Sequence, residues 1–166
     1  MTELINCEIN SNSKPIDVIS GGDSRDWDFS NPVAFNIGLP HAKLYKNKAP
    51  IGADMDGKLV LPVADLNNMG SSPRDLWLPQ IINGGGIAKD ILFFVDRMED
   101  GVEEMEKLGL NRYAVISLDP SAWQLLLDSG KVDSKTYQSM NERLENKQAW
   151  AHNMLLNNTF NFLYLI

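Results

Sequence analysis

A short apolar run, a small polar loop and a helix start follow one another in residues 57–74, and this stretch most constrains the fold of the chain. Residues 58–63 open with a Gly-Lys turn and become apolar, which is typical of a buried strand. Residues 64–72 are small and polar, so they suit a tight loop that presents backbone N–H groups. Pro73 after Ser72 predicts a helix that begins there, with Ser72 as its N-cap. A loop of this kind at a helix N-terminus is a common site for a phosphate group, although many such units bind nothing.

Apolar runs alternate with helical patterns along the rest of the chain. We expect helices over 28–37 and 102–108, and strands over 16–20, 59–63, 91–95 and 113–117. The run 91–95 is continuously apolar, which is typical of a strand covered on both faces. Pro79 follows too late to cap the helix from Pro73, so we expect a kink or an early stop there. The alternation predicts an α/β fold with a parallel-rich central sheet and helices on both faces.

The length of 166 residues fits one domain, and we expect residues 1–166 to form it. Residues 1–15 are polar and predict a weakly structured lead-in, or at most an edge strand. Residues 133–166 predict a helical extension with an apolar tail, in which 160–166 form an extra strand or a docked end.

Charge and cysteine content narrow the class of protein. The net charge of −7 argues against nucleic acid or an acidic membrane as the main partner. Cys7 is the single cysteine and cannot form an internal disulfide. The N-terminus has no leader pattern, and no apolar run is long enough to span a bilayer. We therefore expect a cytoplasmic protein.

Three polar segments fall where predicted strands end: residues 21–25, residues 65–72 and the pair Asp96-Arg97. Ligands of parallel sheets bind beyond the carboxyl ends of the strands, so we expect these segments to converge on one site. The adjacent glycines of the first segment are expected to turn with positive φ and to approach a ligand. A purely structural interpretation stays open, in which the glycines only turn, Asp65 only caps the loop, and Arg97 only pairs with an acid such as Glu99 or Asp100.

In this order the segments resemble those of the type I phosphoribosyltransferases, and of the orotate phosphoribosyltransferases in particular, over about residues 16–120. Asp17-Val18-Ile19-Ser20-Gly21-Gly22-Asp23-Ser24-Arg25 is similar to the family's strand and diphosphate-binding turn. Residues 37–40 and 45–48 are similar to its next helix exit and the base of its catalytic loop. Val63-Ala64-Asp65-Leu66, continuing to Gly70-Ser71-Ser72, is similar to its loop for phosphoribosyl diphosphate (PRPP). Val95-Asp96-Arg97, followed by Glu99-Asp100-Gly101, is similar to the strand end whose arginine contacts orotate.

The chain also departs from the family pattern. Ala64 replaces the first of the two acids usual at the PRPP loop, and Asn67-Asn68-Met69 replaces its threonines and glycines. The catalytic loop is reduced to about residues 49–56, and the N-terminal hood over the base is largely missing, because residue 16 already begins the first core strand. Two hypotheses therefore stand. One is an orotate-type enzyme, and the other is a non-catalytic relative that binds PRPP or a nucleotide in a regulatory or structural role.

The resemblance implies transfer of ribose 5-phosphate from PRPP to orotate or a related pyrimidine base, with diphosphate as the other product. Asp65 would bind the ribose hydroxyls and is a catalytic candidate together with Lys46 and Lys48. Backbone N–H groups of residues 68–72 would hold the 5′-phosphate, which would approach at Gly70, and Arg97 would pair with the substrate carboxylate. Mg²⁺ is implied, held through PRPP and with Asp65 as one option for a protein ligand. A homodimer is implied as well. The substrate-binding candidates are Gly21, Gly22, Asp23, Ser24, Arg25, Asn67, Asn68, Met69, Gly70, Ser71, Ser72 and Arg97.

Overall fold

A computed structural model describes the backbone of residues 1–10 and 15–162, and side chains as far as residue 156. The chain divides into two compact units, Met1–Ser117 and Leu118–Ile166, where the sequence predicted a single domain of residues 1–166. The first unit carries the sheet, and the described part of the second unit is helical.

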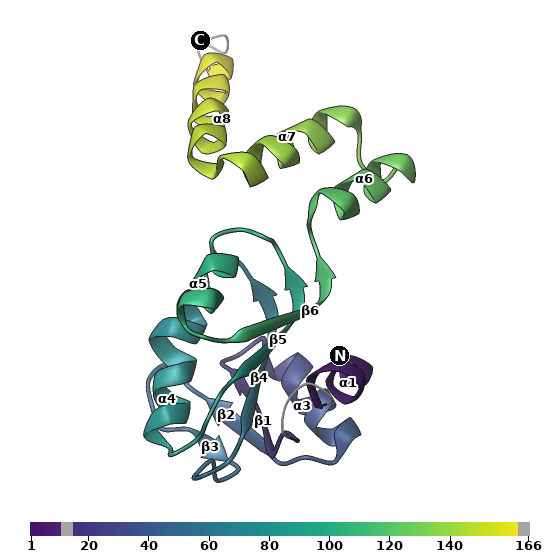
Figure 1. Cartoon of the computed structure of the whole chain (residues 1–166). Coiled ribbons are helices and arrows are strands. Elements are labelled where there is room, and N and C mark those ends of the chain that lie inside the picture. The colour runs from purple at the N-terminus through teal and green to yellow at the C-terminus, as the bar shows by residue number, and fades with distance from the viewer. Residues whose placement is uncertain (11–14, 163–166) are drawn as a thin grey trace. The chain divides into compact units, whose positions relative to one another are not determined.

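The first unit is built on one sheet whose strands lie in the order β3-β2-β1-β4-β5-β6 (Figure 1). Neighbouring strands are parallel, except that β3 is antiparallel to β2 at one edge. The predicted α/β fold with a parallel-rich sheet is therefore confirmed. The strands are β1 (Val18–Gly22), β2 (His41–Leu44), β3 (Ile51–Gly52), β4 (Val60–Asn67), β5 (Asp90–Asp96) and β6 (Asn111–Ser117).

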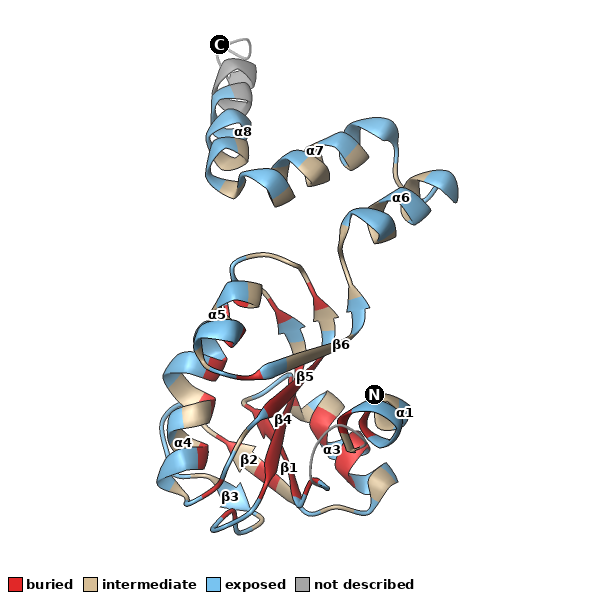
Figure 2. Cartoon of the chain, viewed as in Figure 1, coloured by how far each residue is buried: buried red, intermediate tan, exposed pale blue. Residues whose placement is uncertain are grey.

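Helices cover both faces of this sheet, as predicted, and the central strands between them are largely buried (Figure 2). Apolar strand residues alternate between two cores, one on each face. Val18, Val60 and Ile91 belong to the first core, which includes residues of α4 (Leu78–Asn83) and α5 (Gly101–Lys107). The residues that follow them, Ile19, Leu61 and Leu92, belong to the second core, which includes residues of α3 (Trp27–Ile37) and the N-terminal helix.

The N-terminal residues are helical, contrary to the weakly structured lead-in predicted for residues 1–15. Helix α1 (Thr2–Leu4) continues as a π-helical segment, Ile5–Ile9. Ile5 and Ile9 are fully buried in the second core. Their four-residue spacing places them on one helix face. This spacing is a helical signal, but the prediction followed the polar composition of the segment instead. The expectation for residues 11–14 lies outside the described residues.

Strand β4 is longer, and the loop after it shorter, than the sequence predicted. Its last residues, Leu66 and Asn67, pair with the last residues of β5, so the ladder continues beyond the predicted end at residue 63. The loop is reduced to residues 68–70, and the helix begins at residue 71. Asp65 therefore belongs to the strand, where its side-chain direction is fixed by the pleat.

The helix after this loop also differs from the prediction. Ser72 makes no side-chain cap, and the carbonyl oxygen of Gly70 accepts the Arg74 N–H at 3.2 Å instead. A π-helical segment, Pro73–Trp77, leads into α4, which continues past Pro79 to Asn83. The early stop that was one of two outcomes expected at Pro79 is thus wrong.

Gly21 and Gly22 lie inside β1, and neither has the positive φ that the sequence analysis expected. The turn follows them at residues 23–26. A Cβ at Gly21 would overlap Ser30, and one at Gly22 would overlap Trp77. These positions are therefore glycine because neighbouring side chains pack directly on the strand backbone.

Strand β5 is covered on both faces only in its first part. Ile91, Leu92 and Phe93 are buried, whereas Phe94 is 36% exposed. The ring of Phe94 meets that of Phe29 in α3, with centroids 5.2 Å apart. The expectation of full cover along residues 91–95 therefore fails at Phe94.

The second unit contains, among its described residues, α6 (Pro120–Asp128), α7 (Ser134–Glu145) and α8 (Lys147–Phe162). Asp119 and Asp133 begin the first two helices as N-caps, which accept backbone N–H groups at 2.9 and 2.7 Å. The predicted extension is thus helical through Phe162, so residues 160–162 are not a strand, and the expectation for residues 163–166 lies outside the described residues. None of the described helices combines the length and the apolar character needed to cross a membrane.

Candidate functional site

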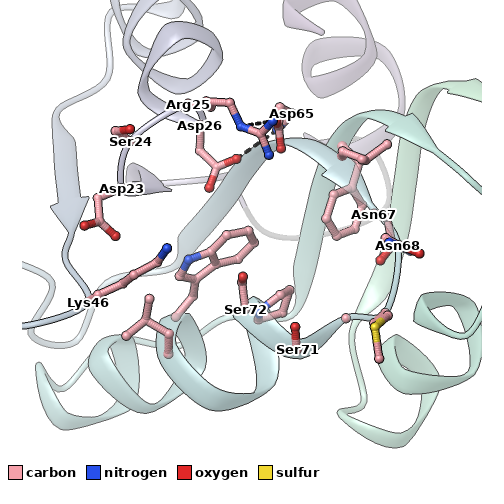
Figure 3. A pocket seen from close by; sticks show the side chains of 17 residues that line it. Asp23, Ser24, Arg25, Asp26, Lys46, Asp65, Asn67, Asn68, Ser71 and Ser72 are labelled. Atoms are coloured by element: carbon pink, nitrogen blue, oxygen red, sulfur yellow. Dashed lines mark hydrogen bonds and ion pairs between the residues drawn. The ribbon is translucent and has the colours of Figure 1, made fainter.

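A cleft of about 440 Å³ opens at the carboxyl ends of β1 and β4 (Figure 3). Its walls come mainly from the turn at residues 23–26, the segment 65–70, and the first turns of the following helix. From β1 the chain continues to β2 on one side, and from β4 to β5 on the other, so the cleft lies where the strand order reverses. This is the usual ligand position in open α/β sheets. Two of the three predicted polar segments therefore meet here.

Residues 68–72 bring the loop and the helix N-terminus to the cleft. The first N–H groups of a helix have no intrahelical acceptor, so Ser71 and Ser72 leave donors beside the positive end of the helix dipole. Gly70 has a φ of 69°, and a Cβ there would lie 2.8 Å from side-chain atoms of Glu104 and Met105 in α5. Gly70 is thus required by backbone conformation and by packing on α5, and it also lines the cleft, so the approach of a ligand at this residue stays a prediction.

Two carboxyl groups lie close together on one wall of the cleft (Figure 3). The Asp65 N–H donates to Asp26 Oδ1 at 3.0 Å, and Arg25 Nε lies 3.2 Å from Asp65 Oδ2. Asp26 is only 7% exposed, whereas the side chain of Arg25 is 81% exposed. The arrangement therefore joins one buried acid, one partly exposed acid and a cation that reaches into solvent.

Burial is the main reason why the pKa of Asp26 rises from 3.8 to about 7. The negative charge of Asp65 raises this pKa further, while the Asp65 N–H and the charge of Arg25 lower it. Asp26 consequently keeps its proton over much of the acidic range, where an ordinary aspartate is ionised.

Lys46 also lines the cleft, whereas Lys48 lies elsewhere (Figure 3). The Nζ atom of Lys48 stands 3.9 Å from the centre of the Tyr45 ring, in a cation–π contact. Asp23 and Ser24, joined by a cis peptide bond, line the cleft with Arg25, but Gly21 and Gly22 do not. Of the residues predicted to contact diphosphate, the cleft therefore contains the turn after β1 and Lys46.

Arg97 does not line the cleft. Its Nη2 lies 2.8 Å from Glu99 Oε1, which is the pairing that the structural interpretation anticipated. The neighbouring Asp96 is fully buried and is held by Arg112, by the Met98 N–H at 2.8 Å and by the Asn67 amide at 3.3 Å. Asn67 also lines the cleft, but its side-chain NH2 group donates to the carboxylate of Asp96.

Asp26 and Trp77 are polar or aromatic residues of the cleft that sequence reasoning missed, and the cleft also contains four apolar residues that it did not name as site residues, Leu66, Pro73, Leu76 and Phe93. Asp26 directly follows the predicted segment 21–25, which was ended one residue too early. Trp77 was assigned only to a helix, and no sequence signal distinguishes a helix tryptophan that faces a cleft from one in the core.

Comparison with known proteins shows which family and fold this chain resembles. A curated orotate phosphoribosyltransferase of Saccharolobus solfataricus is 30% identical over 118 residues, which are 68% of this chain and 60% of that protein. The structure of Mycobacterium tuberculosis orotate phosphoribosyltransferase in complex with PRPP superposes with a TM-score of 0.56 and 25% identity over 70% of each chain. The chain is a divergent relative of the type I phosphoribosyltransferases.

The structure of orotate phosphoribosyltransferase from Francisella tularensis matches this chain with a TM-score of 0.68 and 18% identity. The match covers 87% of this chain and 74% of the other. At that identity the likeness establishes the fold. The chain spans about 60% of the length of the curated protein that it matches. No family model matches the chain.

Proposed function

We propose that this chain is an orotate-type phosphoribosyltransferase, which transfers ribose 5-phosphate from PRPP to orotate and releases diphosphate. The observation that carries the proposal is the cleft, in which a carboxylate at the end of β4 stands next to a helix N-terminus and a polar turn from β1. A ligand with a phosphate, a diol and a diphosphate matches these three features in one molecule.

Each part of the cleft is assigned to one part of PRPP. The N–H groups of Ser71 and Ser72 would bind the 5′-phosphate at the positive end of the helix dipole. Asp65 would accept hydrogen bonds from the ribose hydroxyls. Lys46 and Arg25 would offset the charge that grows on the leaving diphosphate, which lowers the barrier when such groups are positioned in advance.

Mg²⁺ fits this donor set only if the substrate supplies most of its ligands. Within residues 1–10 and 15–156, no group of three ligating side chains could hold a metal ion. Mg²⁺ retains several waters and binds phosphate oxygens readily, so it would enter with PRPP, with an Asp65 oxygen as the available protein ligand. When bound, it would neutralise charge on the diphosphate.

The base side of the reaction is assigned to Arg97, which lies outside the cleft lining and whose guanidinium would exchange its pair with Glu99 for the carboxylate of orotate. The observed pair between Arg97 and Glu99 and the alanine at position 64 favour a second candidate, a non-catalytic relative that binds PRPP or a nucleotide. Assembly as a homodimer stays a prediction, which light scattering would test.

Orotate consumption in the presence of PRPP and Mg²⁺ tests the proposal, with Arg97→Ala as the variant. The enzyme hypothesis predicts a raised KM for orotate in Arg97→Ala with unchanged PRPP affinity. Lys107→Ala is the matched control, because it also removes the cation of an ion pair, with Glu103 at 3.3 Å, but on an exposed helix face. PRPP binding without orotate consumption by the wild type would support the second candidate, and the absence of both would overturn the proposal.

A further inference from the structure

At position 64, where the phosphoribosyltransferase pattern has the first of two acids, this chain has an alanine. Ala64 is fully buried in the first core, paired in register with Phe93. A carboxylate introduced there would be desolvated among apolar side chains. Position 64 therefore leaves the proposed ribose site with Asp65 as the single acid from β4.

Asp26 supplies a second carboxyl group to the same wall, from a different element (Figure 3). It stands directly before α3, yet its side chain makes no cap bond to that helix. Its Oδ1 instead accepts the Asp65 N–H from β4 at 3.0 Å, which fixes the carboxyl group next to Asp65. Capping, the usual structural reason for aspartate at this position, is thus absent.

The second oxygen of Asp26 takes no part in that bond. Oδ2 lies close above Gly22, where a Cβ would be 2.8 Å away, so a larger residue at position 22 would displace the carboxyl group. Only a glycine leaves room for both Asp26 and Trp77 at this point of β1. Glycine at position 22 therefore leaves room for the nearly buried carboxyl group of Asp26, which lines the polar cleft.

We propose that Asp26 and Asp65 together form the diol-binding pair of the cleft, with Asp26 in place of an acid at position 64. The inference rests on the proposed binding of PRPP and adds a ligand-binding residue from outside the β4 loop. Asp26 Oδ2 would accept a hydrogen bond from one ribose hydroxyl, and the Asp65 carboxylate one from the other.

The test compares two ligands that differ mainly in the diol. Ribose 5-phosphate carries the hydroxyls, whereas tetrahydrofurfuryl phosphate has the same five-membered ring and phosphate without them. Affinities for both are measured by calorimetry with the wild type and with Asp26→Asn, which keeps an acceptor for the Asp65 N–H and replaces the proposed acceptor Oδ2 by an amide NH2 group. Asp28→Asn is the matched control, because it makes the same chemical change on an exposed position of α3 outside the cleft.

The expected result is a preference of the wild type for ribose 5-phosphate that falls about ten-fold in Asp26→Asn and stays unchanged in Asp28→Asn. Asp26→Ala, which removes both oxygens, should lower the preference at least as far. An unchanged preference in Asp26→Asn would overturn the inference while leaving PRPP binding intact. A wild type that binds neither sugar phosphate nor PRPP would overturn the proposed function and the inference with it.

Discussion

Replacement of Asp26 by asparagine should stabilise the protein at alkaline pH. The carboxyl group is 7% exposed, and its pKa is raised from 3.8 to about 7, chiefly by burial. An asparagine side chain has the same shape and can still accept the Asp65 N–H that Asp26 Oδ1 accepts at 3.0 Å. The variant therefore removes the ionisation without removing the contact.

The magnitude follows from the interval between the two pKa values. In the unfolded chain Asp26 loses its proton near pH 3.8, and in the folded chain only near pH 7. Folding binds a proton between these values, so the stability of the wild type falls as the pH rises and the loss is complete above about pH 7. At roughly 1.4 kcal/mol per unit the loss is at most about 4 kcal/mol, of which about 3 kcal/mol develops between pH 5 and pH 8.

Urea unfolding of the wild type and Asp26→Asn at several pH values measures this difference. We expect the variant to gain on the wild type steadily from pH 5 to pH 8, by on the order of 10 °C if the same comparison is made by thermal unfolding. Asp28→Asn, exposed on α3, should show no such trend. The same stability difference at pH 5 and pH 8 would refute the reasoning. A variant that is more stable but binds ribose 5-phosphate less well would exemplify the trade-off between stability and function.

Two further variants test the packing around the site. Arg112→Leu should lower the free energy of unfolding by about 3–5 kcal/mol, because the fully buried Asp96 loses its cation. Adding Asp96→Asn should recover part of this loss in urea unfolding, and a double variant no more stable than the single one would contradict the explanation. Gly70→Ala should destabilise the protein more than Gly130→Ala. Both glycines have φ near +70°, but only a Cβ at Gly70 meets atoms of α5. Equal losses in thermal unfolding would show that contact with α5 is unimportant.

The fold was predictable because its strands carry strong local signals. Residues 91–93 and 59–63 are apolar without interruption, as expected for strands between two layers of helices. The N-terminal helix was missed because its buried isoleucines stand in a polar segment, and their burial depends on the second core, which they share with residues of α3, β1 and β4. The end of β4 was misplaced because Asp65 and Asn67 have low intrinsic preference for strands, and pairing with β5 overrides that preference.

The site was predictable in its position but less so in its members. The convergence of residues 23–25 with 65–72 follows from the parallel topology alone. Arg97 was placed on the same edge, but strand pairing does not determine which way a side chain at a strand end turns, and here it pairs with Glu99. Asp26 was not predicted as a site residue because its burial and its hydrogen bond to Asp65 exist only in the folded chain. The two residues are 39 positions apart in the sequence.

Direct titration with PRPP and Mg²⁺ tests the central claim, that the cleft beyond β1 and β4 is a PRPP site. Calorimetry of the wild type should give saturable binding at one site per chain. Asp65→Asn should weaken that binding, because the ribose hydroxyls lose a charged acceptor worth about 1.5–3 kcal/mol. Absence of PRPP binding by the wild type, or equal affinity in Asp65→Asn, would contradict the account.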